Sequence, residues 1–143
     1  MKKYIFSLVV LISLAFSDTV DCGDGNIYSV KKQTKNDRRF DKYTKIKKGP
    51  KLKKGKLDDI IDEKLKVFGV GKTQIFNLNY QFTVTCKGKI VDVKSLGAKH
   101  MADWTNIVDI IKSTEGLWKP AKKDGEFVDC VFFNKKFVWG SDY

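Results

Sequence analysis

The sequence predicts a small two-layer α+β domain between residues 56 and 143, in which a helix packs on a three-stranded antiparallel sheet. Three observations support this fold class. Apolar residues recur at helical spacing in two segments, apolar and polar residues alternate strictly near residue 80, and a stretch rich in Val and Phe lies near the C-terminus. The expected element order is helix, strand, strand, helix, strand.

An apolar stripe predicts the first helix, over residues 57–68. The stripe consists of Leu57, Ile60, Ile61, Leu65 and Phe68. Their spacing places all five side chains on one side of an α-helix. Asp58 and Asp59 lie in the first turn, where carboxylates interact favourably with the helix dipole, and Gly69 and Gly71 favour an end to the helix.

The strongest local pattern predicts a strand over residues 77–86. Its apolar positions are Leu78, Tyr80, Phe82, Val84 and Cys86, and every residue between them is polar. This period of two is typical of a strand with one buried and one solvated face. Because the turn at residues 87–89 is short, a second strand over residues 90–96 must run antiparallel to the first.

A second amphipathic helix and a last strand complete the expected domain. The helix is predicted over residues 99–113, with Met101, Trp104, Ile107, Val108 and Ile111 on its apolar side. An irregular connector and a turn follow. The strand is predicted over residues 127–139, with a bulge or bend near Asn134, where the alternation weakens.

Residues 1–17 have the pattern of a signal peptide. Lys2 and Lys3 precede an apolar run, and Ala15 and Ser17 are small residues at the expected cleavage site. The run would form a helix of about 20 Å, shorter than the roughly 30 Å hydrocarbon layer of a membrane. We therefore expect an exported protein, periplasmic or secreted, without a retained transmembrane helix; an uncleaved anchor is the alternative.

Positive charge is concentrated in one segment. Between Lys31 and Lys56 there are 13 Lys and Arg against two Asp, a net charge of +11. With few large apolar residues and with Gly49, Pro50 and Gly55, residues 18–55 are expected to form a flexible basic arm. The arm is either a solvated spacer or a contact for polyanions such as nucleic acid or an anionic surface. Two Arg among 13 cations argue against specific nucleic-acid recognition.

The three cysteines leave two alternatives open. Thiols of exported proteins usually pair. Cys86 and Cys130 both lie in predicted strands of one sheet, whereas Cys22 lies in a glycine-containing segment. A Cys86–Cys130 disulfide requires α-carbons within about 7 Å. The alternative is two buried free thiols, and Cys22 is the expected unpaired cysteine.

No catalytic, metal or cofactor site is predicted. One His and three Cys are too few for a multi-ligand zinc site, and His100 beside Lys99 has the setting of a surface or capping residue. A secreted hydrolase would need His100. The glycine pairs Gly23/Gly25 and Gly69/Gly71 lack the third glycine of a phosphate-binding loop. We expect a protein that is not an enzyme and has no cofactor.

The connector before the last strand carries a more specific element. It reads Leu117-Trp118-Lys119-Pro120-Ala121 and is followed by Lys122-Lys123-Asp124-Gly125. Together with the alternating strand and the strand after it, this element resembles the C-terminal domain of TonB-type energy transducers. The resemblance covers the chain from Leu57 onward. Trp118, Pro120 and Gly125 also have structural explanations, as a helix anchor, an extended-backbone residue and a turn residue.

The resemblance implies a protein-interaction module that pairs a segment of an envelope or outer-membrane protein with an exposed sheet edge. It places that edge on the last strand, at Phe127, Val128, Asp129, Cys130, Val131, Phe132 and Phe133. The chain has only two prolines and lacks the proline-rich spacer of a full transducer. We therefore expect a stand-alone exported version of the domain and no energy transduction.

Overall fold

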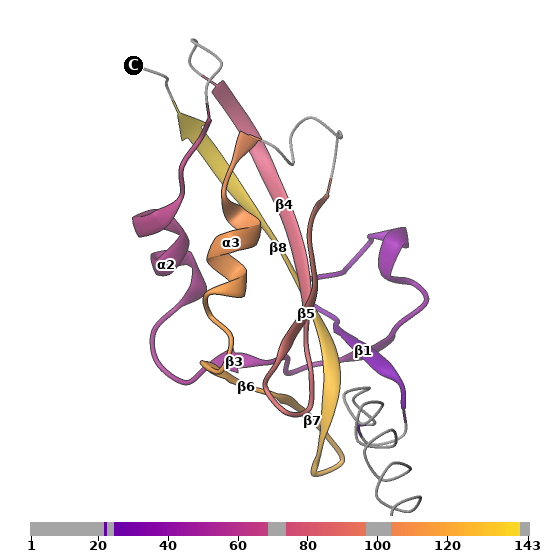
Figure 1. Ribbon diagram of the computed structural model, residues 1–143. Helices are drawn as coiled ribbons and strands as arrows, with labels where there is room; N and C mark the ends of the chain where they lie inside the picture. The colour runs from indigo at the N-terminus through magenta and orange to yellow at the C-terminus, as the bar shows by residue number, and fades with distance from the viewer. Residues whose placement is uncertain (1–21, 23–24, 69–73, 97–103, 141–143) are drawn as a thin grey trace, which may run out of the picture.

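Two long antiparallel strands form the centre of the fold in the computed structural model, which describes residues 22, 25–68, 74–96 and 104–140 (Figure 1). These strands are β4 (Gln74–Val84) and β8 (Glu126–Gly140), and they pair along their whole overlap. β5 (Ile90–Leu96) pairs antiparallel with the other side of β4. Helices α2 (Leu57–Lys64) and α3 (Ile107–Lys112) lie on one face of these strands (Figure 1). The expected α+β class is confirmed.

The alternating strand supplies the centre of the main hydrophobic core. Leu78, Tyr80, Phe82 and Val84 are at most 1% exposed, and they pack with Leu57 and Ile61 of α2 and with Ile107, Ile110 and Ile111 of α3. Each large apolar side chain buried in this way stabilises the fold by about 1.5–3 kcal/mol. The predicted period of two therefore identifies the core face of this strand correctly.

The opposite face of β4 is less solvated than its polar residues predict. Gln81 and Thr83 are buried, and they share this face with their register partners Phe133 and Val131 on β8. Phe40 of the short 3-10 helix η1 (Arg38–Phe40) packs against Val131 and Phe133, and its ring centroid lies 4.8 Å from that of Phe133. The N-terminal segment therefore covers part of a face that was expected to be wet.

The expectation of a flexible basic arm is wrong for residues 25–55. β1 (Ile27–Val30) pairs parallel with β8, and β2 (Thr44–Ile46) pairs parallel with β1, which gives a six-stranded sheet of order β2-β1-β8-β4-β5 with β7 (Ala121–Lys123) beside β8. Few apolar residues are enough to fix this segment, because Tyr28 and Val30 complete a cluster whose other buried members come from the C-terminal part of the chain. The side-chain oxygen of Gln33 also accepts a hydrogen bond from the Phe133 N–H at 3.0 Å.

The expected edge over residues 127–133 is wrong at Cys130 and Val131. β7 pairs with residues 126–128 of β8, and β1 pairs with residues 129–131. At Cys130 and Val131 both sides of β8 are therefore paired, with β1 and with β4, because the N-terminal segment folds back onto the strand. Beyond Phe133, β4 is the only strand paired with β8 in the described part of the chain.

The helices are shorter than predicted. α2 ends at Lys64, and Asn106, just before α3, binds that end: its side chain donates to the Lys64 carbonyl at 3.1 Å and accepts from the Lys66 N–H at 2.8 Å. Val67 then forms a β-bridge with Thr105. Tertiary pairing thus ends the helix before the glycines do. α3 begins at Ile107, and residues 97–103 of the predicted helix, His100 among them, lie outside the described residues.

The irregularity expected near Asn134 lies elsewhere. β8 pairs with β4 in continuous register through Asn134, whereas the register between β4 and β5 shifts between Gln81 and Thr83. Asp92 on β5 has a φ of 53°, a left-handed conformation typical of some β-bulges. Residues 1–17, with the predicted signal peptide, lie outside the described residues, and no helix among those described is long and apolar enough to span a membrane.

Candidate functional site

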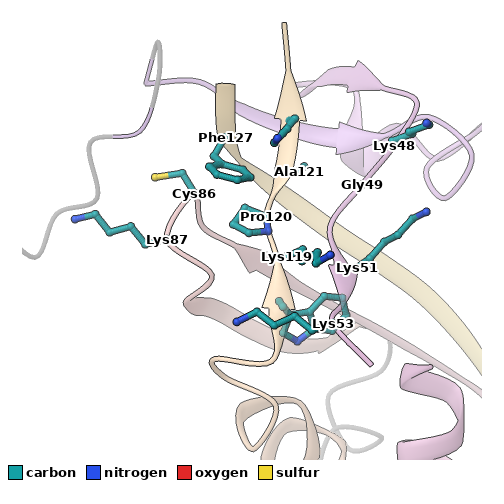
Figure 2. A pocket seen from close by; sticks show the side chains of 12 residues that line it. Lys48, Gly49, Lys51, Lys53, Cys86, Lys87, Lys119, Pro120, Ala121 and Phe127 are labelled. Atoms are coloured by element: carbon teal, nitrogen blue, oxygen red, sulfur yellow. The ribbon is translucent and has the colours of Figure 1, made fainter. Parts of the chain in front are cut away.

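A cavity of about 730 Å³ is the candidate functional site, and we call it the lysine-rimmed cavity (Figure 2). Six exposed lysines line it: Lys48, Lys51, Lys53, Lys87, Lys119 and Lys122. Its other side chains are the apolar Trp118, Pro120, Ala121 and Phe127, together with Cys86. Among the described residues that line it, none carries a carboxylate.

A short two-stranded sheet positions the lysines on one side. β3 (Lys51–Leu52) pairs antiparallel with β6 (Trp118–Lys119), so that Lys51 lies directly opposite Lys119. The Lys53 N–H extends the pairing by donating to the Leu117 carbonyl at 2.8 Å. Like charges directly opposite one another destabilise a strand pair. This sheet therefore places two lysine side chains on the same face, directly opposite one another, without a favourable charge pair between them.

The remaining lysines come from two loops and a strand, with Lys48 in the segment between β2 and β3. Lys87 belongs to the turn between β4 and β5, and Lys122 lies on β7. Cys86 and Lys87 lie on one side of the cavity and Lys48 and Lys51 on the opposite side, with Pro120 and Phe127 between them (Figure 2). Segments far apart in the chain therefore contribute positive charge to one concave surface.

Among the described residues, no salt bridge neutralises these lysines. The salt bridges among the described residues are Arg39–Asp37 and Lys136–Asp62, and neither includes a lysine of the cavity. Lys53 donates weakly to the Gly116 carbonyl at 3.3 Å, and the Lys122 ammonium lies 4.9 Å from the ring centroid of Phe127. The cavity therefore has a positive potential that an anionic group would reduce.

The floor of the cavity is apolar and firmly anchored. Trp118 is 3% exposed, and its indole N–H donates to the Thr114 hydroxyl at 2.9 Å. Its ring meets those of Phe82 and Phe132 edge-on, at centroid distances of 5.3 and 5.4 Å. Because β6 is held by this packing, the floor is formed before any ligand binds.

A disulfide borders the cavity, and it differs from the expected one. Cys86 pairs with Cys22, with 5.8 Å between their α-carbons, and Cys130 is the free, buried thiol. Cys130 cannot meet Cys86, because it lies opposite Val84 and packs between Tyr28, Val30 and Ala121, whereas Cys86 lies beyond the end of β4. Burial raises the pKa of the Cys130 thiol to about 12.

Asp129 fixes the position of the disulfide on the β8 side. Its carboxylate accepts a hydrogen bond from the Cys86 N–H at 2.8 Å. Desolvation by burial raises the pKa of Asp129, and the Cys86 hydrogen bond opposes that shift. Cys22, Cys86 and Asp129 are the one group of three metal-ligating residue types gathered in the described part of the chain. Since the two sulfurs are bonded to each other, the group offers a single carboxylate for a metal.

A second basic cavity, of about 500 Å³, is a weaker candidate. Lys31, Lys32, Lys35, Lys45 and Lys47 line it, but so does Asp41. The Lys45 ammonium already donates to the Thr34 hydroxyl at 2.9 Å and to the Phe40 carbonyl at 2.8 Å. The Lys45 ammonium therefore has two short hydrogen bonds within the fold, whereas Lys53 in the lysine-rimmed cavity has a single one of 3.3 Å.

Sequence reasoning identified only half of the site. The basic segment supplies Lys48, Lys51 and Lys53, and of the seven expected edge residues only Phe127 lines the cavity. Lys87, Lys119 and Lys122 were not singled out as binding residues, because no local pattern shows that these positions meet residues 48–53. Comparisons of the chain with protein-family models, with curated proteins and with solved structures gave no match.

Proposed function

We propose that this protein binds anionic ligands at the lysine-rimmed cavity. The observation that carries the proposal is the Lys51–Lys119 register pair at a concave surface with six lysines and, among the described lining residues, no carboxylate. A carboxylate at either position would stabilise the strand pair, whereas a second lysine destabilises it. A bound anion relieves the repulsion, so that the unfavourable arrangement becomes favourable in the complex.

The chemistry of the site supports binding more than catalysis. Lysine ammonium groups on flexible stems act as point charges and do not impose a fixed geometry on an anion. Because all six are exposed, each contact contributes little, and affinity depends on their number and on ionic strength. We therefore propose a binding protein that is not an enzyme, with affinity that falls steeply as salt rises.

An exported location fits this function. The expected signal peptide at residues 1–17 and the Cys22–Cys86 disulfide both support it, since disulfides persist in oxidising compartments. Anionic polymers and anionic surfaces are the partners proposed there. In this account the basic segment acts as part of a folded site and not as a flexible arm.

Binding of inorganic polyphosphate to the oxidised protein, titrated at several salt concentrations, tests the proposal. The variant Lys51→Gln/Lys53→Gln/Lys119→Gln removes three charges from the cavity. The matched control Lys64→Gln/Lys94→Gln/Lys112→Gln removes three exposed charges elsewhere. We expect the cavity variant to bind at least tenfold more weakly and to show a shallower dependence of log affinity on log salt, because fewer counterions are released. An equal loss of polyphosphate affinity in both variants would reject a localised site.

A second candidate function is strand addition to an envelope protein segment, as the TonB-type resemblance implies. The observation that favours it is the outer half of β8, where Phe137 and Trp139 are each 66% exposed and β4 is the only paired strand among the described residues. The Phe133 N–H points away from β4 to Gln33, so the N–H of Phe137, four residues further along a regular strand, points the same way.

Phe137→Pro and Phe137→Ala separate strand addition from side-chain docking. Proline removes the outward N–H donor, whereas alanine keeps it. If a guest strand pairs here, a partner captured from envelope extract is retained by the alanine variant and lost by the proline variant, with thermal unfolding showing that both fold. Retention by the proline variant would contradict strand addition at this position.

A further inference from the structure

The lining of the cavity divides by chemistry into a charged rim and an apolar floor. The rim consists of ammonium groups, and the floor of Trp118, Pro120, Ala121 and Phe127. Phe127 is 48% exposed, and its ring lies near Cys86 and Pro120 in the lining of the cavity (Figure 2). An accessible aromatic ring in the lining gives the cavity an apolar surface beside its charges.

The described residues of the floor also offer no free side-chain donor to an anion. The indole N–H of Trp118 already donates to Thr114, and Pro120 has no N–H even on its backbone. A phosphate or sulfate placed on this floor would lose its water without gaining hydrogen bonds, which is strongly unfavourable. Charged groups therefore bind at the rim, and the floor suits the apolar part of a ligand.

The volume of the cavity and its rigidity fit such a ligand. Its 730 Å³ falls within the roughly 300–1,000 Å³ of small-molecule sites. Lys122 stacks over the Phe127 ring, and the edge-on contacts of Trp118 hold β6 in place. Because these contacts exist without ligand, binding needs little ordering of the site.

We infer that the ligand of the lysine-rimmed cavity is an amphiphilic anion, with an alkyl or aryl body on the Pro120–Phe127 floor and a phosphate, sulfate or carboxylate head at the rim. This inference rests on the proposed anion-binding function and names its ligand class. Charge complementarity selects the head, and the accessible apolar floor selects the body. A free amphiphile and an anionic lipid share this chemistry.

Calorimetric titration of the oxidised protein with decyl phosphate below its micelle concentration tests the inference. Inorganic phosphate probes the anionic head alone, and decanol probes the alkyl body alone. We expect decyl phosphate to bind at least tenfold more tightly than either. From hexyl to decyl phosphate, affinity should rise about two- to fourfold per methylene, as expected when a chain leaves water. Equal affinity for phosphate and decyl phosphate would overturn the inference.

Two variants of exposed aromatic residues on β8 locate the apolar contact. Phe127→Thr removes the ring from the cavity floor, whereas Phe137→Thr removes a comparable exposed ring outside it. Threonine suits a strand, so both variants are expected to fold. The rise in affinity per methylene of the alkyl phosphate should shrink in Phe127→Thr and persist in Phe137→Thr. An unchanged gain in Phe127→Thr would contradict the assigned floor.

Vesicles identify the source of the amphiphile. Cosedimentation with phosphatidylglycerol vesicles that is weakened by Phe127→Thr indicates a lipid ligand, and binding of monomeric decyl phosphate without vesicle binding indicates a free amphiphile; either result supports the class. Vesicle binding that Phe127→Thr does not affect would come from surface electrostatics and would count against the inferred ligand class.

If polyphosphate binds and decyl phosphate binds no more tightly than inorganic phosphate, the proposed function stands and only this inference fails. If no anion binds, both fail.

Discussion

Lys51 on β3 and Lys119 on β6 are direct register partners in a two-stranded antiparallel sheet. The lysine-rimmed cavity opens beside them, and no carboxylate among the described residues lines it. The pair therefore weakens the sheet that holds it in the absence of a ligand. Stability and binding place opposite demands on position 51, and substitutions there should separate them.

Lys51→Glu should raise stability and lower anion affinity together. The new carboxylate lies opposite Lys119 and converts a repulsive cross-strand pair into an attractive one, worth about 0.2–1 kcal/mol. Polyphosphate affinity should fall more than in Lys51→Gln, because glutamate also repels the ligand. Urea unfolding and titration measure the two effects. Lys54→Glu, at an exposed neighbour that does not line the cavity, is the control, and a similar loss of affinity there would contradict the local account.

Removal of the Cys22–Cys86 disulfide should destabilise the protein substantially. The bond joins residues 64 positions apart, and the chain-entropy model gives about 4 kcal/mol for a loop of this size. Urea unfolding of Cys22→Ser/Cys86→Ser against the oxidised wild type measures the loss. Peptide mapping without reductant should show Cys22 linked to Cys86. A Cys86–Cys130 peptide would contradict the observed pairing.

Cys130 should be unreactive in the native state. Burial raises the pKa of its thiol to about 12, so the nucleophilic thiolate is scarce at pH 8, and the side chain is fully enclosed. Iodoacetamide should modify the oxidised protein only after urea unfolds it, which mass spectrometry can follow. Rapid labelling under native conditions would show that β1 does not stay packed against β8.

Asp129 should make the stability depend on pH in the acid range. Its folded pKa is raised, chiefly by desolvation, so the native state holds the proton more tightly than the unfolded state. The stabilisation that protonated Asp129 gives to the folded state is therefore fully present below the unfolded pKa of about 3.9. It is lost as pH rises through the folded pKa. Relative to Asp129→Asn, which can still accept from the Cys86 N–H, the wild type should lose stability as pH rises from 3.5 to 7.

Urea unfolding of both proteins across this range measures that difference. A wild type that gains stability over Asp129→Asn with rising pH would contradict the prediction. In that case the hydrogen bond from Cys86 to the charged carboxylate would outweigh desolvation.

Periodic segments of the sequence predicted their own structure well. Leu78, Tyr80, Phe82 and Val84 alternate with polar residues and all lie in the core, because a strand places every second side chain on the same face. Leu57 and Ile61 likewise mark the buried side of α2. These signals are local, so a single segment is enough to carry them.

Features that depend on distant pairing were not predictable in this way. The contact between Gln33 and Phe133 joins residues 100 positions apart, and Tyr28 is buried by residues near position 130. Neither shows in the basic segment itself, which reads as disordered by composition. The choice of Cys22 as partner of Cys86, and the meeting of Lys51 with Lys119, follow from the same folding back of the N-terminal segment.

The most direct test of the anion-binding site is a two-dimensional ¹H–¹⁵N spectrum of the oxidised protein during titration with polyphosphate. The account predicts that the largest shifts cluster at residues 48–53, at Lys87 and at residues 117–122, which surround the lysine-rimmed cavity. Shifts centred on residues 31–47, or spread evenly over all lysines, would contradict it.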